Sequence, residues 1–311
     1  MAFAEPGIYQ ARRHARSEFL PIRKLRYHVR IWEPIVTASR NDADAAMSQL
    51  APTLFLLHGW MDVSASFQFL VDCLAPHWRV IAPDWRGYGQ TQWTGSDSYG
   101  FADYLADLEA LLDHYSPQQA VNLVAHSMGG NVATFYAGIR PERVVKLINL
   151  EGIGLRGAGD EQAPDRYGRW LDQIKAGARL RDYDSAQAVA QRLMKTNPRL
   201  RSDYANYLAR FWSAPNALGR YQILGDPAHK IVNANLYRVD EANACWQRIR
   251  ASVVLVLSEH TGKWQDFINS PGYQARLALI DKLQIERIAS AGHMMHHDQP
   301  AAVAALIEKY C

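Results

Sequence analysis

Short apolar runs bounded by turn residues recur along the chain and alternate with stretches of helical periodicity. Most of the runs are apolar at consecutive positions, which is typical of strands that are buried on both faces of a parallel sheet. They are residues 53–57, 79–83, 121–125, 144–150, 253–257 and 283–288. Helical spacing of apolar residues follows at 65–74, 101–115, 128–136 and 301–310. This alternation predicts an α/β fold with a mostly parallel, doubly wound sheet.

The start of the chain departs from this alternation. Residues 19–23 and 25–32 show short alternating patterns around Arg23 and Lys24, which predict two strands that begin a sheet. Residues 33–52 are rich in small and acidic side chains and are long for a connection. We expect them to form an exposed loop that is mobile at its middle.

The pattern also changes between the strands at 144–150 and 253–257. This stretch is rich in Trp, Tyr and Arg and shows helical segments at 167–176, 185–195 and 201–212, without strand runs. It predicts a helical insert. The expected organisation is therefore a core made of residues 1–151 and 241–311, with a helical cap at 152–240.

Composition and charge exclude several classes of protein. The chain has 311 residues, 48% of them hydrophobic, which is enough for a sizeable core. A formal charge of +3 is too small to indicate nucleic-acid binding. No apolar run approaches the roughly 18 residues that span a bilayer, and the first residues lack the features of a signal peptide. We therefore expect a cytoplasmic protein without stable membrane insertion.

The three cysteines add no chemistry to this picture. Cys73, Cys245 and Cys311 are odd in number and far apart, which argues against a disulfide framework or a zinc site built from paired cysteines.

One stretch carries the strongest chemical signal. Residues 121–136 read VNLVAHSMGGNVATFY, which predicts a strand, a sharp turn and a helix. Ser127 lies at the turn, where its hydroxyl is exposed at the strand end. The N–H of Met128, at the start of the helix, points at whatever that hydroxyl attacks. Small residues at 125 and 129 allow the flanking backbones to pass closely.

This stretch resembles the nucleophile elbow of the α/β-hydrolase superfamily, with Ala125 in place of the first glycine of Gly-x-Ser-x-Gly. A serine needs a base within hydrogen-bond reach and a third group that orients the base. The resemblance implies His293 as the base, because Gly292-His293 follows the last predicted strand and precedes the last helix, where the family's Gly-His motif lies.

The acid departs from the commonest form of the family. The resemblance places an aspartate after the strand 253–257, but this chain has Thr261 there, and threonine cannot stabilise an imidazolium by charge. In one branch of the haloalkane dehalogenases the acid instead lies 24 residues beyond the nucleophile, which is Glu151 here. We predict Glu151 as the acid and keep Glu259 as the alternative.

The loop after the strand 53–57 resembles the family's source of a second oxyanion-hole donor. The backbone N–H of Trp60 is expected to pair with that of Met128, and His58 is expected to hold the loop. Asp84, in the segment Asp-Trp-Arg-Gly-Tyr-Gly, resembles a scaffold element of the family and is not expected to do chemistry.

The predicted substrate pocket draws on both parts of the chain. Its candidate residues are Trp60, Met61, Trp170, Phe211, Trp212 and Met294, although aromatic residues at helical spacing often serve packing alone. Residues 152–240 contain 14 Lys and Arg against 9 Asp and Glu. This excess favours a substrate with an anionic part, and a solvated helix face explains it equally well.

Two further patterns resemble a metal or cofactor site but fit neither. His296, His297 and Asp298 could be metal ligands, but their spacing fits no recognised zinc motif, so we expect His296 and His297 at the surface or the pocket rim. The segment 152–157 fits Gly-x-Gly-x-x-Gly, yet the residues after it cannot open the helix that would hold a pyrophosphate. Neither a metal nor another cofactor is expected.

The combined motifs predict a serine hydrolase that cleaves an ester, thioester or lactone and takes a small-molecule acyl substrate. A serine at 127 argues against dehalogenase and epoxide-hydrolase chemistry, which needs an alkyl ester on a carboxylate. Three other chemistries can use the same triad: C–C bond hydrolysis, cofactor-free peroxidation and hydroxynitrile cleavage. A ligand-binding protein without catalysis is the alternative from another class.

Overall fold

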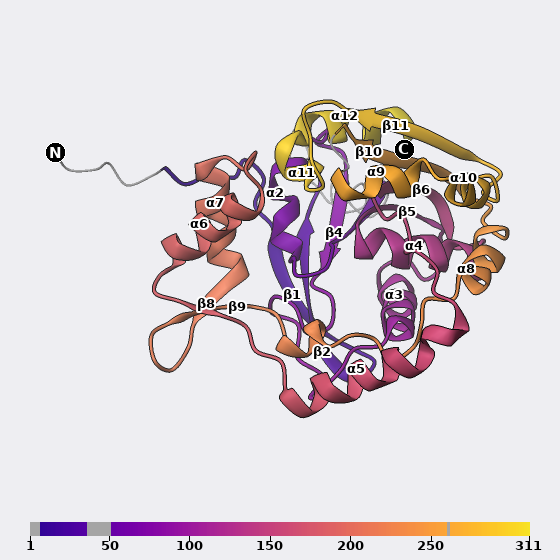
Figure 1. The fold of residues 1–311 in the computed structure, drawn as a ribbon. Helices are drawn as coiled ribbons and strands as arrows, with labels where there is room; N and C mark the ends of the chain where they lie inside the picture. The colour runs from indigo at the N-terminus through magenta and orange to yellow at the C-terminus, as the bar shows by residue number, and fades with distance from the viewer. Residues whose placement is uncertain (1–6, 36–50, 260–261) are drawn as a thin grey trace.

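A computed structural model describes residues 7–35, 51–259 and 262–311, and its centre is an eight-stranded sheet (Figure 1). The strand order is β1-β2-β4-β3-β5-β6-β10-β11. The β1–β2 and β2–β4 pairs are antiparallel, and all later neighbours are parallel. The strands are β1 (Arg16–Ile22), β2 (Leu25–Trp32), β3 (Thr53–Leu57), β4 (Arg79–Pro83), β5 (Val121–His126), β6 (Val144–Leu150), β10 (Ser252–Ser258) and β11 (Leu283–Ile288).

Both faces of this sheet are buried. Along β3, Phe55 and Leu57 contribute to one hydrophobic cluster, whereas Leu54 and Leu56 contribute to another on the opposite face. Such alternation follows from the two-residue period of a strand. The predicted doubly wound α/β fold is therefore confirmed.

Helices cover the two faces of the sheet (Figure 1). Apolar residues of α3 (Phe101–Tyr115), α4 (Met128–Ile139), α8 (Val239–Trp246), α9 (Gln265–Ile268) and α10 (Pro271–Leu277) pack in the first cluster. The second cluster takes residues from η1 (Ser64–Phe67), α2 (Gln68–Val71), α11 (Met295–Asp298) and α12 (Pro300–Tyr310). No helix among the described residues is long and apolar enough to cross a membrane.

The stretch between Glu151 and α8 holds the predicted helical segments and also a small sheet. Helices α6 (Ala186–Thr196) and α7 (Ser202–Trp212) share a third hydrophobic cluster, whereas α5 (Ala163–Ala176) has no buried residue. The expectation of no strands is wrong, because β7 (Asp182–Tyr183), β8 (Ser213–Pro215) and β9 (Tyr221–Ile223) form a sheet in the order β7-β9-β8. Strands of two or three residues are too short to show a period. The division into core and cap stays a prediction.

Element bounds agree closely with the sequence for the core. Strands β3, β4, β6 and β11 and helix α3 have the predicted limits. The helix expected at 65–74 is shorter and begins with the 3-10 turn η1. Most of the loop predicted at 33–52 lies outside the described residues.

Candidate active site

The turn between β5 and α4 has an unusual backbone at Ser127. Its φ is 51° and its ψ is −113°, and its N–H donates to the carbonyl of Leu150 at 2.9 Å. The following helix passes very close to β3, because a Cβ on Gly129 would lie 2.5 Å from the carbonyl oxygen of Leu57. A glycine is therefore required there. Backbone strain of this kind is concentrated at functional sites, where surrounding packing enforces it.

His293 reaches Ser127 from the loop between β11 and α11. Its Nε2 lies 3.0 Å from the Ser127 Oγ, and 47% of its side chain is exposed. The hydroxyl and the imidazole are thus in hydrogen-bond contact at the surface of a hollow, where a substrate can reach both.

Glu151 completes the contact from the end of β6. Its Oε2 lies 2.7 Å from the His293 Nδ1, and its Oε1 accepts hydrogen bonds from the backbone N–H of Ser258 at 2.8 Å and from the Ser258 hydroxyl at 2.5 Å. Burial raises the pKa of the Glu151 carboxyl, but the hydrogen bonds from His293 and Ser258 outweigh burial and hold the pKa below its usual value. The carboxylate is therefore ionised and fully oriented.

The alternative acid has a different partner. Glu259 is exposed, and its Oε2 accepts the N–H of Ser290 at 2.8 Å. Thr261, at the position where the family's aspartate was expected, lies outside the described residues. The structure thus brings together Ser127, His293 and Glu151, and among the polar partners of these three, sequence reasoning missed Ser258. The one signal for Ser258 was a polar residue that ends an otherwise apolar strand.

Left-handed backbone marks the ends of several strands around this site. Among the described residues, five that are not glycine have positive φ. Met61, Ser127, Glu151 and Ser290 follow β3, β5, β6 and β11, and the fifth, Arg23, lies in the β1–β2 turn. Non-glycine residues seldom adopt this conformation, so the loops around the candidate site share a costly backbone geometry.

The loop after β3 brings Trp60 to the same edge of the sheet. Met128 is the first residue of α4, so its N–H belongs to the helical turn that has no partner within the helix. A Cβ on Gly59 would lie 3.2 Å from the Ser127 Cβ, which places the Trp60 loop against the elbow. The indole N–H of Trp60 donates to the carbonyl of His229 at 3.2 Å.

Buried polar contacts fix the scaffold beneath this loop. The His58 Nε2 accepts the N–H of Trp85 at 2.9 Å, and burial lowers the pKa of His58. Asp84 accepts N–H bonds from Ser64 and Gln90 and contacts the His28 Nδ1 at 2.7 Å. Both residues hold backbone segments in place, as the sequence predicted.

A cavity of about 120 Å³ opens beside the serine. Its walls differ from the predicted pocket residues and come largely from the segment after Glu151 and from α9. They are Ser127, Asn131, Glu151, Ile153, Gly154, Leu155, Trp264, Ile268 and His293. Ile153 and Leu155 could have been found from their place just after the acid. Trp264 and Ile268 follow β10 at the same sheet edge but gave no distinctive pattern.

The predicted pocket residues lie elsewhere or at the margins. Phe211 lines a different cavity and packs under the Arg30 guanidinium, 4.3 Å from its ring centroid. The Trp60 side chain is 53% exposed, and Met61 packs against the core. Trp170 lies on α5, Trp212 ends α7, and Met294 follows the base. Their role in substrate binding stays a prediction.

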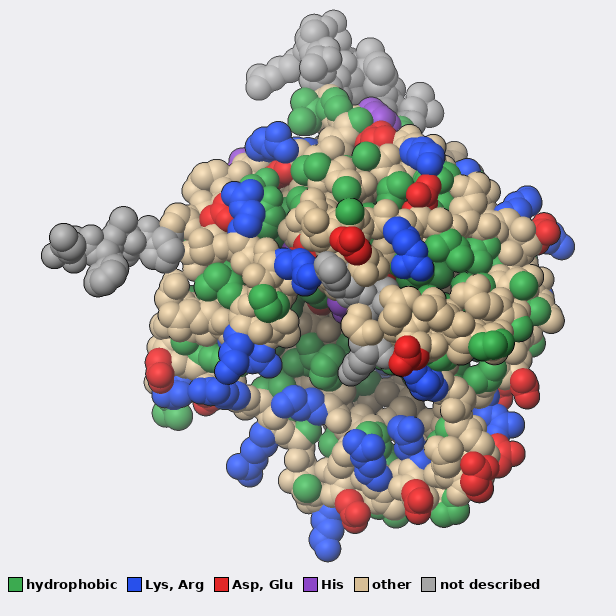
Figure 2. All heavy atoms as spheres, turned by 45° about the horizontal axis from the view of Figure 1, so that its top comes forward, with side chains coloured by type: hydrophobic (Ala, Val, Ile, Leu, Met, Phe, Trp, Pro, Cys, Tyr) green, Lys and Arg blue, Asp and Glu red, His purple; other side chains and the backbone are tan. Residues whose placement is uncertain are grey.

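A larger cavity of about 500 Å³ lies under α5. Ala163 and Tyr167 of that helix line it, together with the chain around Leu236 and Arg238. Figure 2 shows a hollow near the middle of one face, with hydrophobic side chains at its floor and Lys and Arg side chains along its margin.

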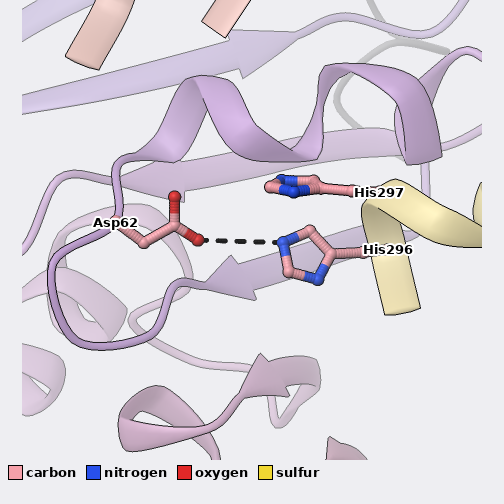
Figure 3. A group of neighbouring side chains, drawn as sticks. All are labelled: Asp62, His296 and His297. Carbon is pink, nitrogen blue, oxygen red and sulfur yellow. Dashed lines mark ion pairs between the residues drawn. The ribbon is translucent and has the colours of Figure 1, made fainter. Parts of the chain in front are cut away.

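The expected position of His296 and His297 is wrong. Their exposed fractions are 0% and 4%, so they lie in the interior rather than at the surface or pocket rim. The carboxylate beside them is Asp62, and ligand atoms of the three residues lie within 4.8 Å of one another (Figure 3). Asp298 instead accepts hydrogen bonds from the N–H of Gly292 and the side chain of Asn197. Short helix α11 turns the two histidines inward, which the sequence pattern did not predict.

Known proteins resemble this chain, some of them over most of its length and others over a part of it. A family model described as the alpha/beta hydrolase fold matches residues 52–300. A serine hydrolase-like protein of Danio rerio is 25% identical over 82% of this chain and 79% of that protein. A pimeloyl-(acyl-carrier protein) methyl ester esterase of Yersinia pseudotuberculosis is 39% identical, over 35% of this chain and 39% of that protein. A thioesterase domain from the curacin biosynthetic pathway has a TM-score of 0.80 at 21% identity and covers 95% of this chain and 99% of its own.

Proposed function

We propose that this chain, which belongs to the α/β-hydrolase family, hydrolyses a carboxylic ester, thioester or lactone through an acyl-enzyme on Ser127. The observation that carries the proposal is the continuous line of contacts from hydroxyl to carboxylate. The Ser127 Oγ lies 3.0 Å from the His293 Nε2, and the His293 Nδ1 lies 2.7 Å from the Glu151 Oε2. This arrangement has the order nucleophile, base and orienting acid that activates a serine.

Each group has one task in the proposed reaction. The Ser127 hydroxyl attacks the carbonyl carbon while the His293 Nε2 takes its proton, and the imidazolium then gives that proton to the leaving group. A water molecule, activated by His293 in the same way, then attacks the acyl-enzyme, releases the carboxylic acid product and regenerates Ser127. Because Glu151 accepts from Ser258 on one oxygen, its other oxygen is held toward the His293 Nδ1. The carboxylate thereby keeps the proton of the neutral imidazole on Nδ1, so that Nε2 is free to accept the proton of the Ser127 hydroxyl.

The tetrahedral intermediate needs donors for its oxyanion. We assign this role to the backbone N–H groups of Trp60 and Met128, which flank Ser127 from two different loops. Each such donor is worth about 3 to 4 kcal/mol of transition-state stabilisation. The donors act on charge that develops only in the transition state, so they raise kcat rather than ground-state binding.

The site itself favours acyl transfer over related chemistry. An oxygen nucleophile on serine forms an acyl ester with a carbonyl substrate, whereas halide or epoxide opening in this family needs a carboxylate nucleophile. The names of the Yersinia esterase and the curacin thioesterase fit ester and thioester cleavage, which supports this choice.

The substrate has a small reacting part and a larger remainder in this proposal. The cavity beside Ser127 is only about 120 Å³, whereas the one under α5 is about 500 Å³. We assign the first to the group next to the carbonyl and the second to the remainder of the substrate. Beside the base, the Arg199 guanidinium and the Asp298 carboxylate both lie close to Gly292, so their charges offset one another there. An anionic substituent is favoured only by the excess of Lys and Arg over Asp and Glu in residues 152–240.

Hydrolysis of nitrophenyl esters with acyl chains of increasing length tests this function. We expect turnover by the wild-type enzyme, labelling of Ser127 by a fluorophosphonate probe, and loss of both in Ser127→Ala. If folded wild-type protein shows neither turnover nor labelling, a ligand-binding role replaces the hydrolase. A panel of C–C, peroxide and cyanohydrin substrates separates the other triad chemistries.

A further inference from the structure

Another buried carboxylate and imidazole lie beneath the candidate catalytic centre. Asp62 follows the Trp60 loop, and His296 lies three residues after His293. The Asp62 Oδ2 is 3.7 Å from the His296 Nε2, and the two side chains are 2% and 0% exposed. Figure 3 shows them pointing toward one another from the loop after β3 and from α11.

The pair joins the two loops that carry the proposed oxyanion donor and the proposed base. The other Asp62 oxygen accepts the N–H of Val63 at 2.8 Å, so the carboxylate is fixed to its own loop. The His296 ring packs on Phe67, with ring centroids 5.1 Å apart. Because both side chains are removed from water, the surroundings screen the electrostatic interaction between them little.

His126 fills the gap between these loops and the nucleophile. Its Nε2 donates to the carbonyl of His293 at 2.8 Å, since a carbonyl can only accept. Its Nδ1 faces Gly59, where a Cβ would lie 2.8 Å away. Its ring centroid is 4.6 Å from that of His296. One buried cluster therefore connects the loop that carries Trp60, the turn at Ser127 and the loop that carries His293.

Burial disfavours the charged form of the other histidines near Asp62. It lowers the pKa of His58, places that of His126 well below its usual value, and lowers that of His297 to about 3. Burial raises the pKa of Asp62, but contact with His296 outweighs it and keeps the pKa below the usual value. Of these rings, His296 is the one whose Nε2 lies 3.7 Å from the Asp62 Oδ2.

We propose that Asp62 and His296 are positioning residues that set the distance between the Trp60 N–H and His293. This inference rests on the proposed hydrolase function and goes beyond it, since neither residue touches the substrate. A metal is the other reading of the cluster. It fits less well, because the His297 Nε2 already contacts the Ser66 Oγ at 2.5 Å. Ligand atoms around a tetrahedral zinc with bonds of about 2 Å lie roughly 3.3 Å from one another, so these three atoms, which are spread over up to 4.8 Å, would have to move closer together.

The variants Asp62→Asn and His296→Gln test the pair against Ser66→Ala, which removes a contact in the same cluster without touching the pair. We expect each of the first two to lower kcat roughly 10- to 100-fold with KM changed less than about threefold, because a misplacement of about 1 Å has that effect. The double variant should lose no more than the worse single one, since the residues act as a unit. Ser66→Ala should keep kcat within about twofold.

Several outcomes overturn the proposal. They are unchanged kcat in both variants, additive losses in the double variant, or an equal loss in Ser66→Ala. Metal analysis of the wild-type protein provides another: one bound zinc that Asp62→Asn loses, with activity lost on chelation, would make the cluster a metal site.

Hydrogen exchange covers the case in which a variant does not fold. In the wild-type protein, the amides of residues 58–62 and those of residues 292–298 should exchange through opening reactions of the same free energy. Clearly different free energies for the two segments would overturn the proposal. If the wild-type enzyme is active and the variants are unaffected, only the positioning role is refuted. If the wild-type protein is inactive and the fluorophosphonate probe does not label it, the hydrolase function is refuted as well.

Discussion

Two regions of the molecule differ in their packing. One is the buried cluster of Asp62, His126 and His296 beneath Ser127, called the junction below, and the other is helix α5. At the junction, Asp62, His126 and His296 have exposed fractions of 2% or less, and the loops around them hold strained backbone. Helix α5 has no buried residue, and Leu171 on it is 57% exposed. Dense packing therefore fixes the loops that carry the proposed catalytic groups. Helix α5, in contrast, is a largely polar, exposed helix beside a cavity of about 500 Å³, the proposed site of the remainder of the substrate. The contrast predicts that substitutions at the junction change kcat, whereas those on α5 change substrate preference.

The largest expected effect comes from the proposed acid. Glu151→Gln keeps the shape of the side chain but removes the charge that stabilises the imidazolium and favours the wrong tautomer of His293. We expect kcat to fall roughly 10³- to 10⁴-fold, measured with a nitrophenyl ester. Glu259→Gln is the matched control and should stay within about twofold. An equal or larger loss in Glu259→Gln would exchange the two roles.

Low pH should reduce the free energy of unfolding through the buried histidine His297 beside the junction, whereas α5 has no buried group that could contribute. His297 has a folded pKa of about 3 because it is buried, whereas an unfolded histidine titrates near 6.5. Between these values the unfolded chain binds a proton that the folded chain does not, so stability falls as pH drops below 6.5. At pH 4.5 this group alone should remove roughly 2 to 3 kcal/mol.

Urea unfolding at pH 7 and pH 4.5 measures this loss. His297→Asn should reduce the difference between the two pH values, whatever its effect on stability at pH 7. His77→Asn, at an exposed position, should leave the difference as it is in the wild-type protein. An unchanged difference in His297→Asn would mean that His297 is protonated in the folded state.

The same substitution should have opposite signs in the two regions. Gly129→Ala places a Cβ 2.5 Å from the backbone oxygen of Leu57 and should destabilise the fold by about 1 to 3 kcal/mol. Gly168→Ala, within α5, meets nothing within 4 Å and should stabilise by about 0.4 to 1 kcal/mol, because the unfolded chain loses freedom. Urea midpoints measure both, and a destabilised Gly168→Ala would show that α5 packs against something.

This contrast also explains what could be predicted from the sequence. Strand β3 and helix α3 have their predicted limits because a buried face imposes a period on consecutive residues. Helix α5 begins at Ala163, four residues before its predicted start, because an exposed first turn carries no such period. Local pattern therefore predicts elements best where the core decides their side chains.

Contacts between distant segments were the part that local pattern could not supply. Ser258 donates to Glu151 across 107 residues of chain, and only the sheet order that places β10 beside β6 makes them neighbours. Asp62 and His296 meet in the same way, across the ends of segments that no periodicity connects. Glu151 itself was found because the resemblance fixed its spacing from Ser127, not because its surroundings could be derived.

The smallest expected effect on stability tests the role of α5. Tyr167 is 48% exposed and lines the cavity of about 500 Å³, so Tyr167→Gln removes little buried surface and should change the free energy of unfolding by less than about 0.5 kcal/mol. If the remainder of the substrate occupies this cavity, kcat/KM for a long acyl ester should fall roughly fivefold, because about 1 kcal/mol of apolar contact is lost. The acetyl ester, which fits beside Ser127, should keep its rate. Leu218→Gln, at an 83% exposed position in the turn after β8, provides the matched control and should affect neither substrate. Equal losses for both esters in Tyr167→Gln would instead make α5 part of the support of the catalytic centre, and the two regions would no longer be separable.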